Sequence, residues 1–179
     1  IYMRNKLKKV AAKLFLLPQW QVGIAYGNIE NILQTQSLPS IQWWPTCSSS
    51  IFNADPFPLN NQIVFERLNR WRGRAEIWIA NTDGTNSKRL FREPWHLSYP
   101  CAFHIGSEDY LVVESSARGI CVIRKFVDGQ WNEISTIPEC LVDPTPLFHH
   151  NRYWIFGTLA NGEENSSLHI WWSETINGP

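Results

Sequence analysis

The chain has 179 residues, which is enough for one domain of ordinary size with its own apolar core. Its 16 basic and 16 acidic side chains cancel, so the charge gives no reason to expect a nucleic acid as the partner. No apolar run reaches the length that crosses a membrane, and the run LFLLP already ends at Pro18.

Residues 1–19 are predicted to form a basic amphipathic helix. Five apolar side chains recur at helical spacing, and Arg and Lys side chains occupy the opposite face; the apolar residues are Leu7, Val10, Ala11, Leu14 and Leu17. A helix of this kind packs on its own domain or lies on a membrane surface, and a peripheral membrane contact is the less favoured of the two.

Residues 20–52 are predicted to be a lead-in of one strand and a loop. The stretch WQVGIAY at residues 20–26 is typical of a strand, whereas residues 27–52 contain Pro39, Pro45 and the run TCSSS.

From residue 53 onward, short apolar runs typical of strands alternate with turn sequences. Examples of the runs are QIVFE, AEIWIA, DYLVVES and RYWIFGT, and the turns NTDGTN, VDGQ and ANGEEN carry Asp-Gly or Asn-Gly at their tips. These dipeptides tolerate the positive φ angles of tight hairpins. The pattern predicts an all-β fold.

An internal repeat indicates the architecture. Asp55-Pro56, Tyr99-Pro100 and Asp143-Pro144 recur every 44 residues, and each pair begins a unit of about four strands. This period is typical of a β-propeller blade, whose first strand lines the central axis. We therefore predict three four-stranded blades, at residues 53–97, 98–141 and 142–179.

Three blades do not close a propeller, because closure takes four to eight. We expect a partial propeller, completed by further C-terminal blades or by another copy of the chain in a homo-oligomer. The strand at residues 20–26 is a second candidate for completing a blade from the N-terminal side.

The four cysteines, Cys47, Cys101, Cys121 and Cys140, are widely spaced and contain no Cys-x-x-Cys pair. We therefore predict no metal site and no cofactor. Cys101 and Cys121 lie in apolar sequence, which favours free buried thiols. Free thiols in turn favour a reducing, cytoplasmic location.

Several motifs resemble one known family, the N-terminal domain of glucosamine inositolphosphorylceramide transferases. The motifs are ADPF at 54–57, HLSYP at 96–100, VVESS at 112–116, VDPT at 142–145 and HIWWSETINGP at 169–179. The resemblance extends over about residues 20–179. That family is similar in turn to the five-bladed propellers of furanosidases, xylosidases, levansucrases and invertases, so the resemblance implies a partial propeller of the five-bladed type.

The resemblance also implies roles for three carboxylates. In the glycosidase propellers an Asp in the first blade is the nucleophile or base, a second blade-start Asp steadies the transition state, and a Glu is the acid. These roles fall on Asp55, Asp143 and Glu114. Glu114 precedes Asp143, which departs from the order of the glycosidases, and Glu66 ends a strand as Glu114 does, which favours a structural role for both.

Three further side chains are candidates for substrate binding. His96 and Trp95 lie directly before the second blade, and Tyr99 replaces the blade-start Asp, where its ring and hydroxyl would face the axis. Each also has a structural interpretation, as a hydrogen-bonded histidine or as an aromatic ring in the core.

We expect a carbohydrate-related domain that binds a glycan or glycoconjugate, or supports a transferase module, without catalysis of its own. The alternative is a glycoside hydrolase of the furanosidase or xylosidase type, working through Asp55, Asp143 and Glu114. A third possibility is a fragment that acts only in assembly.

Overall fold

The computed structural model describes residues 19–162 and 164–178, so the helix predicted over residues 1–19 lies outside the described part except for Gln19. Within it, antiparallel strands form four sheets, accompanied by one α-helix and one 3-10 turn. The predicted all-β class is confirmed. No described helix has the length and apolar character needed to span a membrane.

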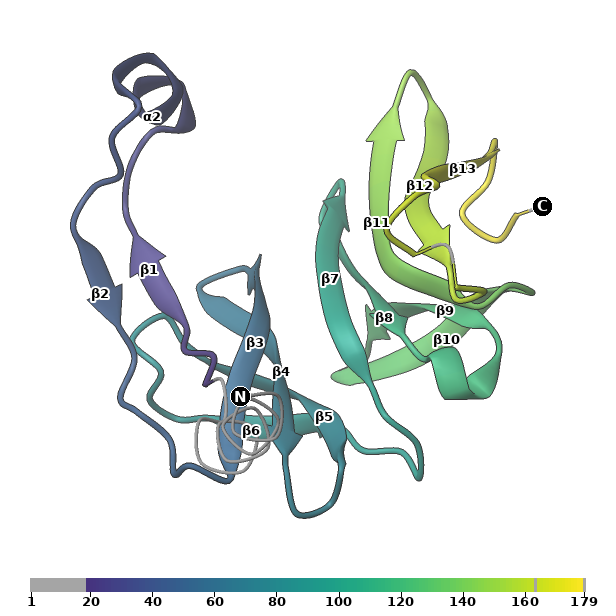
Figure 1. Cartoon of the computed structure of the whole chain (residues 1–179). Helices are drawn as coiled ribbons and strands as arrows, with labels where there is room; N and C mark the ends of the chain where they lie inside the picture. Colours follow the sequence, from purple (N-terminus) through teal and green to yellow (C-terminus); the bar gives the residue numbers. More distant parts are fainter. Residues whose placement is uncertain (1–18, 163, 179) are drawn as a thin grey trace, which may run out of the picture.

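Three sheets follow one another along the chain (Figure 1). The first contains β3 (Ile51–Leu59), β4 (Gln62–Asn69), β5 (Arg74–Asn81) and β6 (Lys88–Phe91). The second contains β7 (Ser98–Ile105), β8 (Glu108–Glu114), β9 (Cys121–Val127) and β10 (Gln130–Ile137), with the 3-10 turn η1 (Ser116–Arg118) between β8 and β9. The third contains β11 (Leu141–His149), β12 (Arg152–Leu159) and β13 (His169–Ser173).

The third sheet differs from the prediction of four strands in every blade. Its described part has three strands in the order β11-β12-β13. The turn after β12 is long in this unit, so the apolar stretch HIWWS becomes the third strand, and residues 174–178 that follow it form bends instead of a fourth.

Tight turns explain why the strands pair with their neighbours. Between β9 and β10, Asp128 has φ of 52° and Gly129 has φ of 80°. Positive φ at both central residues defines the turn whose twist matches that of the strands it joins. The Asp-Gly tip therefore acts as the sequence predicts.

The sheets pack on one another through two apolar clusters. Val64 and Ile77 of the first sheet meet Leu111 and Val113 of the second, all fully buried. Val112 of the second sheet belongs to the cluster that contains Leu141 and Ile155 of the third. Since β7 contacts both β3 and β11, the first strands of the three sheets lie next to one another, as the propeller prediction requires.

The lead-in at residues 20–52 is more ordered than the sequence suggests. It contains β1 (Gly23–Ala25), the helix α2 (Ile29–Thr35) and β2 (Ile41–Trp43). Strand β1 pairs with β2 in a sheet of its own, so the stretch 20–26 adds no strand to a blade sheet. The side chain of Asn28 accepts the N–H of Glu30 and caps α2.

The two flanks of the sheet array differ. Val22 and Trp44 cover the first sheet, and the Trp44 ring lies edge-on to Phe65 at a centroid distance of 5.0 Å. On the third sheet, Ile170 and Trp172 are about half exposed. This exposed apolar side of the third sheet is the surface on which the predicted further blades, or the predicted second copy of the chain, would pack.

Candidate functional site

The same bulge interrupts the first strand of each sheet. Asp55, Tyr99 and Asp143 have φ angles of 47°, 44° and 52°, and the pairing with the next strand shifts by one residue at each. A left-handed conformation in a non-glycine residue costs on the order of 1–3 kcal/mol. Bulges turn a side chain away from its regular direction, and here they do so at the three residues that the sequence repeat singles out.

The proline after each of these residues makes the bulge possible. Proline has no N–H to lose from the ladder, and Pro100 and Pro144 are among the most deeply buried residues of the chain. Within the third sheet the bulge lies opposite Gly157, where an added Cβ would come within 3.2 Å of the Val142 carbonyl oxygen. The backbone is therefore closely packed at this point.

The neighbouring strand places a glutamate beside two of the bulges. Glu66 lies opposite Ala54, and Glu114 lies opposite Ser98, so each is level with the residue before a bulge. The equivalent residue in the third sheet is Thr158, opposite Val142. The prediction that Glu66 ends its strand is wrong, because β4 continues to Asn69. The shared position of Glu66 and Glu114 was the available signal that the two belong together.

Glu66 lies beside Asp55, and its pKa is strongly raised. The Glu66 side chain is nearly fully buried, and burial is the main cause that raises its pKa from 4.5 to about 8. A hydrogen bond to Asp55 and the negative charges of Asp55 and Glu114 act in the same direction. At neutral pH Glu66 therefore retains its proton and donates it in a hydrogen bond to Asp55.

Glu114 and Asp143 join the second sheet to the third. Oε2 of Glu114 accepts the backbone N–H of Asp143 at 3.1 Å. Burial raises the pKa of Glu114, and the charges of Asp143 and Asp55 add to the rise. Burial also raises the pKa of Asp143, followed by the charge of Asp55. The field of Asp55 thus reaches all three of the other carboxyls.

Tyr99 occupies the position between the two blade-start aspartates. Its hydroxyl shares a hydrogen bond of 2.9 Å with Oγ1 of Thr145, and its ring meets Phe57 edge-on at 5.0 Å. Burial raises the pKa of Tyr99, and the charges of Asp143 and Asp55 contribute. The side chain therefore faces the carboxylates in a fixed orientation.

His96 contacts the carboxylate group from the segment before β7. Its Nδ1 accepts the backbone N–H of Ala75 at 3.1 Å, which leaves Nε2 at 3.6 Å from Oε1 of Glu66. Burial lowers the pKa of His96. Since Glu66 keeps its proton, the two side chains meet at neutral pH as neutral groups.

Trp95 lies apart from the carboxylates. Its ring packs against the cluster between the first two sheets, and the Arg118 guanidinium lies 5.9 Å from the ring centroid. Its buried indole N–H has no hydrogen-bond partner. Of the six predicted site residues, the structure brings five together, and a neighbouring pocket is lined by Trp95 and also by His96.

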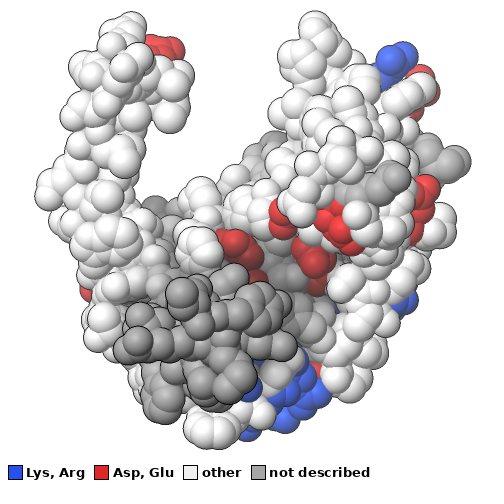
Figure 2. All heavy atoms as spheres, viewed as in Figure 1, with Lys and Arg blue, Asp and Glu red and all other residues white. Residues whose placement is uncertain are grey.

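Acidic side chains gather in a hollow of the molecular surface. Figure 2 shows Asp and Glu side chains gathered in this hollow, between the first and third sheets of Figure 1. We call the group formed by Asp55, Glu66, Glu114 and Asp143 the carboxylate cluster. In the described part of the chain, no three His, Cys, Asp or Glu side chains are arranged to hold a metal ion.

Consecutive antiparallel sheets whose first strands lie next to one another give the described chain a propeller-like arrangement, which solved structures of glycosidases share. A family 117 glycoside hydrolase from Zobellia galactanivorans superposes with a TM-score of 0.52 and 15% identity, over 89% of this chain and 59% of that one. An exo-β-1,3-galactanase from Clostridium thermocellum gives a TM-score of 0.54 and 8% identity, over 87% of this chain and 43% of that one. At such identities the likeness concerns the fold.

The family "Glucosamine inositolphosphorylceramide transferase 1, N-terminal" matches residues 45–179, and the chain belongs to it. Glucosamine inositolphosphorylceramide transferase 1 of Arabidopsis thaliana is 27% identical over 87% of this chain, and that of Oryza sativa subsp. japonica is 26% identical over 89%. The chain spans about a quarter of the length of these relatives. The resemblance seen in the motifs is confirmed.

The pKa of Glu66 predicts how its replacement changes the response of stability to pH. The folded state holds the Glu66 proton up to about pH 8, whereas the unfolded chain releases it near 4.5. Glu66 therefore lowers the free energy of unfolding progressively as pH rises through this interval. Glu66→Gln stays neutral, so we expect this variant to gain stability relative to the wild type between pH 4.5 and 8 in urea denaturation.

A matched control is Glu30→Gln, at an exposed position of α2. It should follow the wild type across the same interval. Parallel pH profiles of the Glu66→Gln variant and the wild type would contradict the assignment of the proton to Glu66.

Proposed function

We propose that the carboxylate cluster binds the sugar of a glycan or glycoconjugate. The observation that carries this proposal is the pairing of Asp55 with a protonated Glu66 at the axis of the sheets. A proton donor beside a carboxylate acceptor matches the hydroxyl groups of a sugar, each of which donates and accepts hydrogen bonds. The family and the glycosidase fold support this choice of ligand.

Within this proposal, an amino sugar is the preferred ligand. The ammonium group of glucosamine carries a positive charge, and the carboxylate cluster supplies negative charge in a partly buried place where attraction is stronger than in water. The relatives from Arabidopsis thaliana and Oryza sativa are glucosamine inositolphosphorylceramide transferases, which supports the same choice. The domain would hold the glycoconjugate, and transfer would take place elsewhere in the longer protein.

The comparison of glucosamine with glucose tests the proposal. We expect glucosamine to bind more tightly in calorimetric or NMR titrations, because only its ammonium group gains from the negative charge. Asp55→Asn removes that charge and keeps the shape, and should weaken glucosamine binding about tenfold. Equal affinities for the two sugars would contradict the amino-sugar preference, and binding of neither would contradict the glycan proposal.

A glycoside hydrolase is the second candidate, favoured by the raised pKa of Glu66 next to Asp55. Hydrolysis requires one protonated carboxyl at the leaving oxygen and one ionised carboxylate at the sugar. The sequence assigned these roles to Asp55, Asp143 and Glu114. Glu66 is a further candidate for the proton donor, because its pKa is raised to about 8 and it is hydrogen-bonded to Asp55.

Aryl furanosides and xylosides separate the two candidates. If the domain is a hydrolase, it should release the aryl group at a rate that falls about a hundredfold or more in Asp55→Asn. Absence of release by a wild-type protein that binds sugar would leave binding as the function of the cluster. Release that survives in Asp55→Asn would show that the activity comes from another site or from a contaminant.

A further inference from the structure

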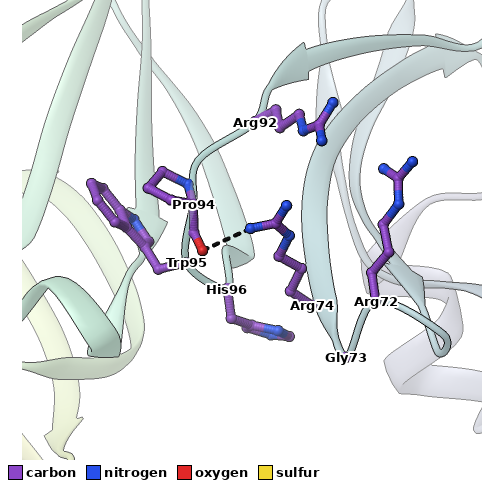
Figure 3. Close-up of a pocket in the computed structure, with 7 residues that line it drawn as sticks. All are labelled: Arg72, Gly73, Arg74, Arg92, Pro94, Trp95 and His96. Atoms are coloured by element: carbon purple, nitrogen blue, oxygen red, sulfur yellow. Dashed lines mark hydrogen bonds between the residues drawn. The ribbon is translucent and has the colours of Figure 1, made fainter.

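A pocket outside the carboxylate cluster has a strongly basic lining. It has a volume of about 510 Å³ and lies between the β4–β5 turn and the segment that joins β6 to β7. Figure 3 shows the guanidinium groups of Arg72, Arg74 and Arg92 around it, with His96 and Trp95. No acidic side chain is among the residues that line it.

The positive charge of this arginine pocket exceeds the negative charge beside it. Arg72 and Arg92 each lie 3.5 Å from Oε1 of Glu76, and Arg89 lies 3.8 Å from Oε2. Oε2 also accepts the indole N–H of Trp78 at 3.3 Å. The buried Glu76 carboxylate is thus the shared ion-pair partner of three arginines. Each of the three distances is longer than that of a good charged hydrogen bond.

The arginines have donors to spare. Nη1 of Arg74 donates to the carbonyl oxygen of Pro94 at 2.7 Å, which holds this side chain across the pocket (Figure 3). The side chains of Arg72 and Arg92 are about half exposed. Each guanidinium has five N–H donors, so several remain directed to solvent. Glu93, the acid next in sequence, acts instead on the pKa values of Arg118 and Arg124.

We propose that the arginine pocket binds the phosphate group of a phosphorylated ligand. Guanidinium groups match phosphate oxygens with two parallel hydrogen bonds, and two or three of them around one cavity can hold a doubly charged anion. The volume lies within the range of pockets for small molecules, so the group esterified to the phosphate also fits. The ligand is anionic, unlike the amino sugar expected at the carboxylate cluster, and the two sites meet at His96, which lines the pocket and contacts Glu66.

The phosphate can belong to a soluble phosphoester or to a lipid headgroup. Trp71 stands between Arg70 and Arg72 on the β4–β5 turn and is 88% exposed. Tryptophan and arginine together at the tip of a turn are suited to the interface between water and lipid. The position of Trp71 therefore provides the variant that separates the two sources.

The experiment titrates the whole chain with inorganic phosphate and with glucose 6-phosphate, against chloride at equal ionic strength. We expect saturable binding of the phosphates that is about tenfold weaker in Arg72→Gln and in Arg92→Gln. Arg92→Lys keeps the charge next to Glu76 but loses the paired hydrogen bonds, so it should bind weakly while remaining folded by circular dichroism. The matched control is Arg152→Gln, whose guanidinium lies over Trp172 on the third sheet and should leave binding unchanged.

Flotation with phosphatidylcholine vesicles, with and without phosphatidylserine, distinguishes the sources. A lipid-borne phosphate predicts binding to the anionic vesicles that is lost in Arg92→Gln and weakened in Trp71→Ala. A soluble ligand predicts phosphate binding in solution that Trp71→Ala does not change. Failure of the wild type to bind in both arms, or equal binding by the Arg92→Gln and Arg152→Gln variants, would overturn the proposal.

Discussion

The arrangement of the candidate site depends on one backbone feature, the left-handed residue that precedes a proline in the first strand of each sheet. A regular strand would send alternate side chains to opposite faces. The bulge breaks this alternation at Asp55, Tyr99 and Asp143. Packing holds Tyr99 and Asp143 in this unfavourable conformation, because the prolines that follow them are buried, whereas Pro56 after Asp55 is exposed. The sheets thereby present three polar side chains to one region.

The bulged first strands also have an electrostatic consequence, because neighbouring carboxyls lie on them and on the strands that follow. The charge of Asp55 raises the pKa values of Glu66, Glu114 and Asp143, each of which burial already raises. Four carboxyls in one place cannot all ionise without cost. The structure resolves this by keeping the proton on Glu66 and by giving Glu114 the N–H of Asp143. Such a mixture of donors and acceptors suits the hydroxyl groups of a sugar, which is why binding is the preferred proposal.

The sequence predicted the parts of the structure that repeat. The all-β class follows from the short apolar runs and the turns, and the X-Pro pairs that recur every 44 residues lie at the bulges of the first strands. The repeat predicts four strands in the third sheet, but the described sheet has three. The turn after β12 is longer than the corresponding turns of the other two sheets, so the repeat does not carry over to this part of the chain. Helix α2 was missed because its seven residues are a short element with no buried side chain. Glu66 was assigned a structural role because a pKa depends on partners that only the register of β3 and β4 reveals.

The central claim is that Glu66 holds a proton at neutral pH in a hydrogen bond to Asp55. It is tested most directly by NMR titration of the side-chain carboxyl carbons of the glutamates, assigned by comparison with Glu66→Gln. We predict that the Glu66 signal titrates with a midpoint near pH 8, and that Asp55→Asn moves the midpoint to lower pH. A midpoint close to the ordinary value of 4.5 in the wild type would contradict the account.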